Sequence, residues 1–393
     1  MKNSATPLKI DTKKIIERYM INDGLTEMAA NAVEVVVDKN TGIAYAVYLS
    51  SETSIGESSE LVRLAKFNIM QPTNVEWVTI FNKETDFSGH ILSECNILEL
   101  DSSTVRVFVI DRVTHTYYYK DVDKKSLNVG FKNEVKFKND EKAIPVSLNM
   151  QNINHFIISK GIEPMKSLNM ITEIIKIGDT YYSILCGHQA NCGLFIKSSD
   201  GATWTYQSLI SHKVNFEAML CFHDSKFWVM CRNGSEEETK DMQQNLMYSE
   251  DGINWTESNL LLTTSDTRPY LFNYQGDLYL AYSSPMPHDF STVRPWRCNV
   301  HIGKIVSCNG IETFEEIIYK ESKFGIVYYS LLDWYGHMIM LYSAGELHPT
   351  EGLMRGWSQG KDCLNYTILH RQEPKLSFNT SSTVKTTDEK LLI

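Results

Sequence analysis

The sequence predicts an all-β protein, a six-bladed β-propeller with a short N-terminal helix. One heptapeptide, Ser-x-Asp-Gly-x-[Thr/Asn]-Trp, occurs at 198–204 and again at 249–255, with 51 residues from start to start. A four-stranded propeller blade takes about 40 to 50 residues, so the repeat has the period of one blade. From about residue 30 onward, apolar residues alternate with a period of two and Gly-bearing turns separate the runs, which indicates strands.

The heptapeptide itself predicts a tight turn. Its Asp can accept hydrogen bonds from backbone N–H groups two residues on, its Gly adopts a positive φ at low cost, and its Ser can cap the turn. The Trp then leaves the turn and packs beneath it. A single copy would be typical of an ordinary Asp-Gly hairpin, but two copies that share four fixed positions favour a structural repeat.

Six sets of strand, turn and strand divide the chain into predicted blades, with five as the alternative count. The sets begin near residues 30, 91, 170, 216, 268 and 328. Before them, residues 11–21 place apolar side chains at helical spacing, and Asn-Asp-Gly ends the run. The predicted organisation is an N-terminal helical extension (1–25), the propeller (26–371) and a polar C-terminal tail (372–393).

Charge and hydropathy exclude several partners. The net charge is −10 and no long basic run occurs, so a nucleic-acid partner is not expected. The N-terminus lacks the apolar core of a secretory signal, and no stretch is apolar enough for a membrane span. We expect a cytoplasmic protein, or a virion-associated one if it is of phage origin. The N-terminal helix is expected to cap the propeller or to attach it to another subunit or a virion.

The cysteines and histidines predict neither a metal site nor a bound cofactor. Eight cysteines are scattered without paired spacing, which favours free thiols. The nearest approach to a metal motif is Cys186-Gly-His188 followed by Cys192, but its spacing differs from the usual zinc patterns and no fourth ligand is near.

The innermost strands of a propeller line a central channel, where side chains distant in sequence meet. Glu217 lies in an apolar run, and Arg232 follows the next strand. Arg297 begins a strand in the fifth predicted blade, and Tyr329 begins the first strand of the sixth. These four residues are the main candidates for a site on the axis.

In order and spacing these residues resemble the C-terminal half of a sialidase domain, and the two heptapeptides resemble the Asp-boxes, or BNR repeats, of that superfamily. The resemblance covers about a third of the chain well. It implies that Tyr329 is the nucleophile, that Glu217 is its base, and that Arg232 and Arg297 hold the carboxylate of an acidic sugar. Arg268, which opens the fifth blade, and His188 complete the substrate-binding candidates.

The chemistry explains these residue types. A sialic acid bears a carboxylate on its anomeric carbon, so an anionic nucleophile would be repelled and a neutral phenol is preferable. Tyrosine has a pKa near 10 and is weak alone, and an adjacent glutamate can take its proton. Guanidinium groups bind a carboxylate through paired N–H bonds, so an acidic protein can still hold an acidic ligand.

The sequence departs from the family at the N-terminal part of the site. No arginine lies between Arg18 and Arg63, where the family carries its first arginine. Ser343 stands where the carboxylate supporting that arginine is expected. No aspartate stands in the loop that holds the family's general acid, and Glu57 is the candidate there.

Three functions therefore remain open. The leading hypothesis is a sialidase-like glycoside hydrolase that acts on an acidic sugar of a glycan. The first alternative is a propeller that binds a glycan without cleaving it, such as a phage receptor-binding or tail protein. The second is a uronate polysaccharide lyase in which Tyr329 serves as base and acid.

Overall fold

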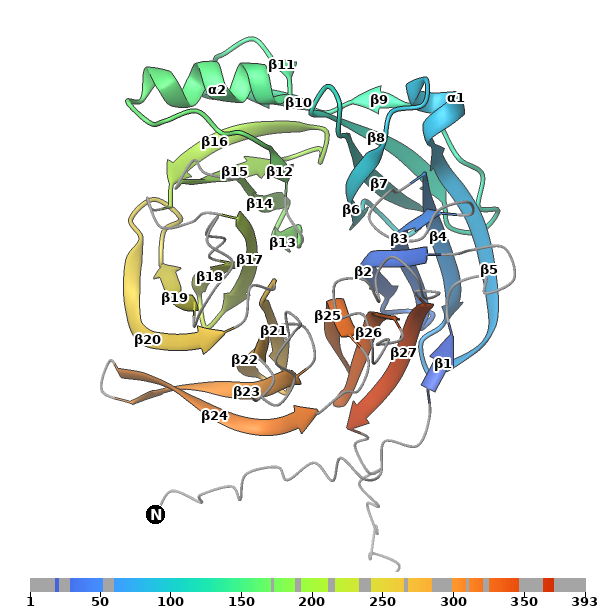
Figure 1. The fold of residues 1–393 in the computed structure, drawn as a ribbon, viewed down its shortest axis with the longest axis vertical. Helices are drawn as coiled ribbons and strands as arrows, with labels where there is room; N and C mark the ends of the chain where they lie inside the picture. The colour runs from blue at the N-terminus through green and yellow to red at the C-terminus, as the bar shows by residue number, and fades with distance from the viewer. Residues whose placement is uncertain are drawn as a thin grey trace, which may run out of the picture.

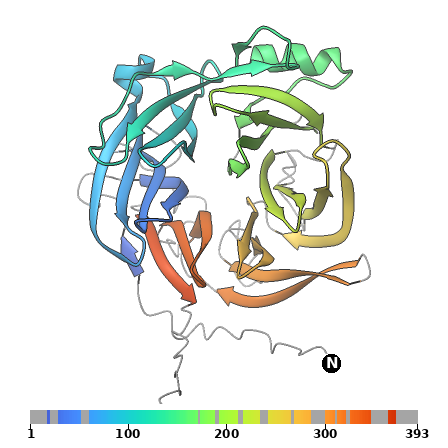
Figure 2. The same ribbon diagram turned by 180° about the vertical axis from the view of Figure 1, so that it is seen from behind.

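The computed structural model describes residues 18–20, 29–51, 60–170, 173–187, 192–210, 216–232, 242–264, 268–284, 299–308, 311–320, 325–345 and 363–370. Within these residues, six β-sheets stand around one axis (Figures 1 and 2), which confirms the predicted six-bladed propeller. In each blade the innermost strand is followed in sequence by strands that lie progressively outward, and blades 3 and 6 gain further outer strands from earlier in the chain.

The first three blades come from the N-terminal half. Blade 1 comprises β2 (Ala29–Asp38), β3 (Ile43–Ser51), β4 (Leu61–Asn68) and β5 (Gln71–Asn82). Blade 2 comprises β6 (Leu92–Glu99), β7 (Thr104–Asp111), β8 (Thr116–Asp123) and β9 (Asn133–Glu134). Blade 3 comprises β12 (Asn169–Met170) and β13 (Ile175–Ile177), which both pair with β14 (Thr180–Cys186), then β15 (Gly193–Ser198) and β16 (Thr203–Leu209). Outside β16, the sheet is widened by β10 (Lys136–Lys138) and β11 (Val146–Ser147).

The other three blades follow in order. Blade 4 comprises β17 (Phe216–His223), β18 (Lys226–Arg232), β19 (Met242–Ser249) and β20 (Thr256–Thr264). Blade 5 comprises β21 (Tyr270–Tyr274), β22 (Asp277–Ser284), β23 (Asn299–Cys308) and β24 (Ile311–Lys320). Blade 6 comprises β25 (Gly325–Trp334), β26 (His337–Gly345) and β27 (Cys363–His370), and β1 (Arg18–Met20) completes it at the outer edge.

The N-terminal helix predicted for 11–21 is wrong for its last residues. Arg18–Met20 form strand β1, antiparallel to β27, with Arg18 opposite Thr367. The open edge of β27 offers unpaired backbone groups, and that tertiary partner outweighs the local helical spacing. The rest of the predicted helix lies outside the described residues.

Two helices that the sequence analysis did not predict lie on the periphery. Helix α1 (Lys83–Phe87) follows β5 and begins at Asn82, whose side chain accepts the Glu84 N–H at 2.8 Å. Helix α2 (Met150–Ser159) covers the outside of blade 3 (Figure 1) and buries Ile153 and Ile157. Neither is long and apolar enough to cross a membrane.

The hydrophobic core is divided among the seams between blades. Its clusters join blade 1 to blade 2, blade 2 to blade 3, blade 3 to blade 4, blades 4 to 6 to one another, and blade 6 back to blade 1. Each blade therefore buries both faces against its neighbours, and the ring is held by burial of apolar surface. Inner strands kept in place this way can hold polar side chains on the axis.

The heptapeptides form the tight turns that the sequence predicts, at equivalent places between the third and fourth strands of blades 3 and 4. In the first, Asp200 Oδ1 accepts the Ala202 N–H at 2.8 Å and the Thr203 N–H at 2.7 Å. In the second, Asp251 Oδ1 makes the same two bonds, each at 2.8 Å. These backbone bonds, led by that of the Asn254 N–H, hold the pKa of Asp251 well below its usual value.

Close packing beneath the first turn requires its glycine. Gly201 has a φ of +66°, and a Cβ there would lie 2.6 Å from Leu98 Cδ2. Gly276 also has a positive φ, +82°, but a Cβ there would meet nothing within 4 Å. We expect Gly201→Ala to lower the free energy of unfolding by about 1 to 3 kcal/mol more than Gly276→Ala, because only the first adds a clash to the same backbone strain. Urea denaturation measures the difference, and equal losses would contradict the packing argument.

Candidate functional site

The inner strands of blades 1, 2, 4 and 6 each carry a one-residue β-bulge close to their start. In three of them the extra residue is polar and has a positive φ: +48° at Glu94, +40° at Glu217 and +46° at Tyr328. A bulge re-aims a side chain relative to the alternation of its strand. The repeated bulges thus place polar groups at one end of the axis, which we call the strand-start end.

Tyr328 and Glu217 meet across this end. The Tyr328 hydroxyl donates a hydrogen bond to Glu217 Oε1 at 3.4 Å, which joins blade 6 to blade 4 across the axis. Glu217 is buried, with 2% of its surface exposed. A buried carboxylate beside a phenol is the arrangement in which a glutamate can take a tyrosine proton.

Arg268 lies beside this pair, two residues before β21 begins. Its guanidinium carbon is 5.4 Å from the centroid of the Tyr328 ring, and its Nη2 is 2.8 Å from Glu34 Oε1. Both side chains of this ion pair are almost fully buried, at 4% and 5% exposure. Ser330 Oγ donates to Val33 O at 2.8 Å and approaches Glu34 Oε2 at 3.4 Å, which fixes Glu34 from the other side.

Each blade thus supplies one chemically active side chain near the axis, and we call this set the channel ring. Its members are Glu34, Glu94, Glu173, Glu217, Arg268 and Tyr328, in blade order from 1 to 6. The charges of the ring act on one another, because the pKa of Arg268 responds to three of these carboxylates.

Burial governs the protonation of the ring. It raises the pKa of Glu34 to about 7, although Arg268 opposes the shift, and Glu94 adds to it. Burial, followed by the charge of Glu34, raises the pKa of Glu173 to about 8. For Arg268, burial would lower the pKa, but Glu34 and Glu217 outweigh it and raise the pKa. Arg268 therefore stays charged, while the carboxyls of Glu34 and Glu173 gain or lose a proton as the pH changes around neutrality.

The structure moves the candidate nucleophile by one residue. Tyr329, the predicted nucleophile, is 2% exposed and lies in the core shared by blades 4 to 6, with its ring centroid 6.4 Å from that of Tyr270. Burial raises the pKa of Tyr329 further above its usual value. The bulge between Val327 and Tyr329 explains the shift, because its extra residue, Tyr328, breaks the alternation and turns to Glu217.

The remaining predicted residues have different outcomes. Arg268 does lie near the Glu217 and Tyr328 pair, but its guanidinium faces Glu34. Arg232 ends β18, and its backbone pairs with Phe216 beside Glu217. The Arg232 side chain, together with Glu57, His188 and Arg297, lies outside the described residues. Their roles stay predictions.

Sequence reasoning missed Glu34, Glu94 and Glu173. Glu34 interrupts the apolar run of β2, which is the same signal that identified Glu217, a carboxylate among residues destined for burial. Blade 1 thus contributes a carboxylate where the resemblance implied an arginine. Among the described residues, no group of three or more metal-binding side chains is close enough to hold a metal ion, and five of the cysteines in this part of the chain are buried free thiols.

The raised pKa of Glu173 predicts how stability changes with pH. Between its unfolded pKa near 4.5 and its folded pKa of about 8, the folded chain keeps a proton that the unfolded chain releases. This contribution to stability is complete below about pH 4.5 and is lost as the pH rises through about 8. We expect Glu173→Gln to flatten the fall of Tm between about pH 5 and pH 8.

A matched control is Glu141→Gln. Glu141 is exposed, and its pKa is lowered by the hydrogen bond from Lys197, so its titration ends at more acid pH. Thermal unfolding followed by circular dichroism gives the two profiles. A Glu173→Gln profile that falls as steeply as that of the unmodified chain would contradict the assignment.

No family model matches this sequence, and no curated protein matches it. Solved structures do match. A Trypanosoma rangeli sialidase in complex with 2,3-difluorosialic acid superposes with a TM-score of 0.58 at 12% identity, covering 87% of this chain and 54% of that one. The chain therefore spans about half the length of that enzyme.

Two bacterial or microbial enzymes give similar values. The NanB sialidase of Streptococcus pneumoniae superposes with a TM-score of 0.54 at 9% identity, covering 89% of this chain and 70% of that one. The Hadza microbial sialidase Hz136 superposes with a TM-score of 0.56 at 14% identity, covering 89% and 67%. At such identities the likeness concerns the fold alone. The chain is a six-bladed β-propeller with a sialidase-like fold.

Proposed function

We propose that this chain is a sialidase-like glycoside hydrolase that removes an acidic sugar from a glycan, with Tyr328 as nucleophile and Glu217 as its base. The observation that carries the proposal is the hydrogen bond from the Tyr328 hydroxyl to Glu217 Oε1 at 3.4 Å. The setting supports it, since both residues lie on bulged inner strands of a fold shared with sialidases.

The proposed reaction uses the pair in two steps. Glu217 accepts the phenol proton as the Tyr328 oxygen attacks the anomeric carbon of the acidic sugar. The bond from that carbon to the rest of the glycan breaks, and the rest of the glycan leaves. Water then attacks the same carbon and gives one proton to Glu57, which has protonated the leaving group in the first step. The bond to Tyr328 breaks, Glu217 returns the proton to the Tyr328 oxygen, and the acidic sugar is released with its original configuration. Arg268, with its guanidinium carbon 5.4 Å from the Tyr328 ring, would stabilise negative charge developing on the phenol.

The sugar carboxylate is assigned to other arginines. Arg268 is already paired through Nη2 with Glu34 at 2.8 Å, so this part of its guanidinium is not open to a second carboxylate. We therefore assign the carboxylate to Arg232 and Arg297, on the family resemblance, and the proton for the leaving group to Glu57.

The same ion pair favours a second candidate, a propeller that binds a glycan without cleaving it, such as a phage receptor-binding or tail protein. The Arg268 guanidinium, which could otherwise stabilise negative charge on the Tyr328 phenol during catalysis, is held in an ion pair with Glu34. Tight binding without product release would favour this candidate over the hydrolase.

The test is an activity assay on the full chain. We expect release of 4-methylumbelliferone from its α-N-acetylneuraminide or its β-glucuronide, and no release from the neutral β-galactoside. Proton NMR of the first product should show retained anomeric configuration, because a covalent intermediate inverts the centre twice. If neither acidic glycoside is cleaved while a glycan array records binding, the hydrolase proposal is wrong and the binding propeller is supported.

A further inference from the structure

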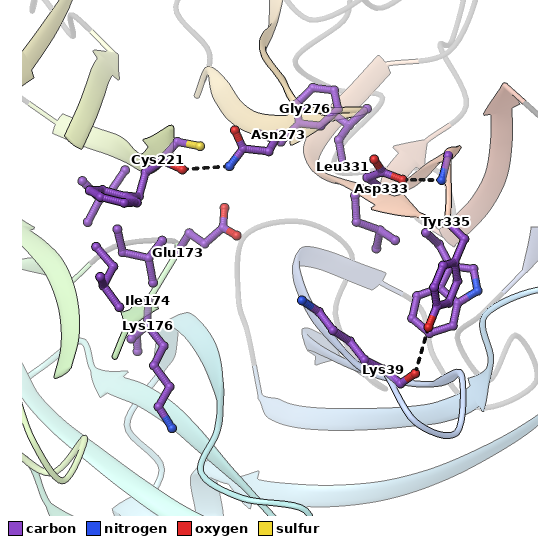
Figure 3. A pocket seen from close by; sticks show the side chains of 18 residues that line it. Lys39, Glu173, Ile174, Lys176, Cys221, Asn273, Gly276, Leu331, Asp333 and Tyr335 are labelled. Carbon is purple, nitrogen blue, oxygen red and sulfur yellow. Dashed lines mark hydrogen bonds between the residues drawn. The ribbon is translucent and has the colours of Figure 1, made fainter. Parts of the chain in front are cut away.

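A cavity of about 730 Å³ opens at the other end of the axis, which we call the turn end (Figure 3). It lies among the turns that join the first and second strands of the blades, and blades 1, 3, 4, 5 and 6 contribute to its wall. Tyr328 and Trp334 are both on β25, six residues apart, and only Trp334 lines the cavity. The wall also includes Leu331, three residues after Tyr328 on β25, so at about 3.3 Å per residue roughly 10 Å of strand separates Tyr328 from the nearest part of the wall.

Tyr335 forms an exposed aromatic surface at the edge of this cavity. It is 71% exposed, and it occupies a two-residue turn with Gly336 in which the φ angles are +49° and +83°. Asn, Asp and Gly are the residues that such turns favour, and a bulky ring with positive φ is costly. Strained residues of this kind cluster at ligand sites, so the strain at Tyr335 indicates that its side chain contacts a ligand.

The ring is also fixed in place before any ligand arrives. Trp334 packs edge-on against it with ring centroids 4.8 Å apart. The Tyr335 hydroxyl donates to the Lys39 carbonyl oxygen at 3.3 Å, from blade 1 (Figure 3). A ring held from both sides loses little conformational entropy when a ligand stacks on it.

Two ionisable groups extend into the cavity. Figure 3 shows the Glu173 carboxyl and the Lys39 ammonium directed into the open space, while Lys176 points away. Lys39 makes no ion pair with any other described residue. Asp333, by contrast, is occupied by the N–H groups of Gln275 at 2.7 Å and Gly336 at 2.6 Å.

The rest of the wall is mostly apolar and includes Ile175, Leu220, Phe272 and Leu331. A purely apolar ligand would bury the polar groups of the cavity without partners, which is unfavourable. A phosphate would be disfavoured, because the carboxyls of Glu173 and Asp333 lie in the wall and would repel it, while Lys39 is the cation that points inward. A ligand with an apolar face and several hydroxyl groups satisfies both kinds of wall, and the volume lies within the usual range for small ligands, about 300 to 1,000 Å³.

We propose that the turn-end cavity binds a sugar of one or two rings, separately from the Tyr328 and Glu217 pair. The apolar face of one pyranose stacks on Tyr335, and its hydroxyls bond to Glu173 and Lys39. An aromatic face combined with a few polar groups is suited to such amphipathic rings. This site does not depend on hydrolysis at the strand-start end.

The decisive variant is Tyr335→Asn. Asn tolerates the positive φ of this turn better than Tyr, so the variant should keep or raise Tm while it removes the ring. The probes are N-acetyllactosamine and cellobiose, titrated into the full chain by saturation-transfer NMR. We expect at least one to bind, Tyr335→Asn to weaken that binding at least about tenfold, and Tyr335→Trp to retain it.

Two controls make the result specific. Phe131→Ala removes another exposed ring, 91% exposed in blade 2 and outside the cavity, and should leave sugar binding unchanged. Glu217→Gln should abolish hydrolysis and leave this binding intact, so the two proposals fail separately. The turn-end site is refuted if neither disaccharide binds at about 10 mM, if Tyr335→Asn binds as well as the unmodified chain, or if Glu217→Gln removes binding.

Discussion

Replacing Tyr328 by Phe is expected to reduce kcat by about 10³-fold or more, whereas Tyr329→Phe should change it less than about threefold. Each substitution removes one hydroxyl and keeps the ring. Of the two tyrosines, Tyr328 places its hydroxyl against Glu217, whereas the Tyr329 ring lies in the core of blades 4 to 6. The adjacent tyrosines are therefore matched controls for each other.

The measurement is kcat on the acidic 4-methylumbelliferyl glycoside that the unmodified chain cleaves, with Tm recorded for both variants. A folded Tyr328→Phe variant with undiminished kcat would exclude this tyrosine as the nucleophile. If Tyr329→Phe were instead the inactive variant, the original assignment from the family resemblance would be restored.

Removal of the Glu34 carboxylate should have the largest effect on stability. Glu34→Ala leaves the Arg268 guanidinium, 4% exposed, without its partner at 2.8 Å. Breaking a buried ion pair from one side typically costs about 3 to 5 kcal/mol, because the remaining charge stays out of water. Urea denaturation should be performed near pH 8, above the Glu34 pKa of about 7, so that the carboxylate is ionised in the unmodified chain.

The control replaces both partners. Glu34→Met combined with Arg268→Met fills the same region with apolar side chains, and we expect it to be markedly more stable than Glu34→Ala. With both single Met variants, this gives a double-mutant cycle whose coupling energy reports the pair directly. Additive losses would show that the two charges do not depend on each other.

The sequence was most informative where local chemistry decides the structure. The Asp and Gly of the heptapeptides specify their turn through bonds between neighbours such as Asp200 and Thr203, and these bonds form as expected. Alternation of apolar residues placed the strands and separated the six blades. Glu217 could be identified because a carboxylate in an apolar run needs a reason to be buried.

The sequence was least informative where distant segments decide. Tyr328 adopts a φ of +46° without being Gly or Asn, so nothing local marks the bulge that exchanges its role with that of Tyr329. Glu34 and Arg268 belong to blades 1 and 5, and their pairing exists only once the ring has formed. Arg18–Met20 become a strand because β27 is present, 349 positions further along the chain (367 − 18).

The pairing of β1 with β27 has a consequence for how this protein is made. A ribosome releases Arg18–Met20 long before Cys363–His370, so β1 has no partner until the five blades between them have been synthesised. Blades built from consecutive segments can form in order as they emerge, since their contacts are close in sequence. Closure of the circle joins residues far apart in the chain, and such contacts form slowly. Until then the outer edge of the last blade is a strand edge open to other chains, so assembly is most exposed to aggregation at its final step.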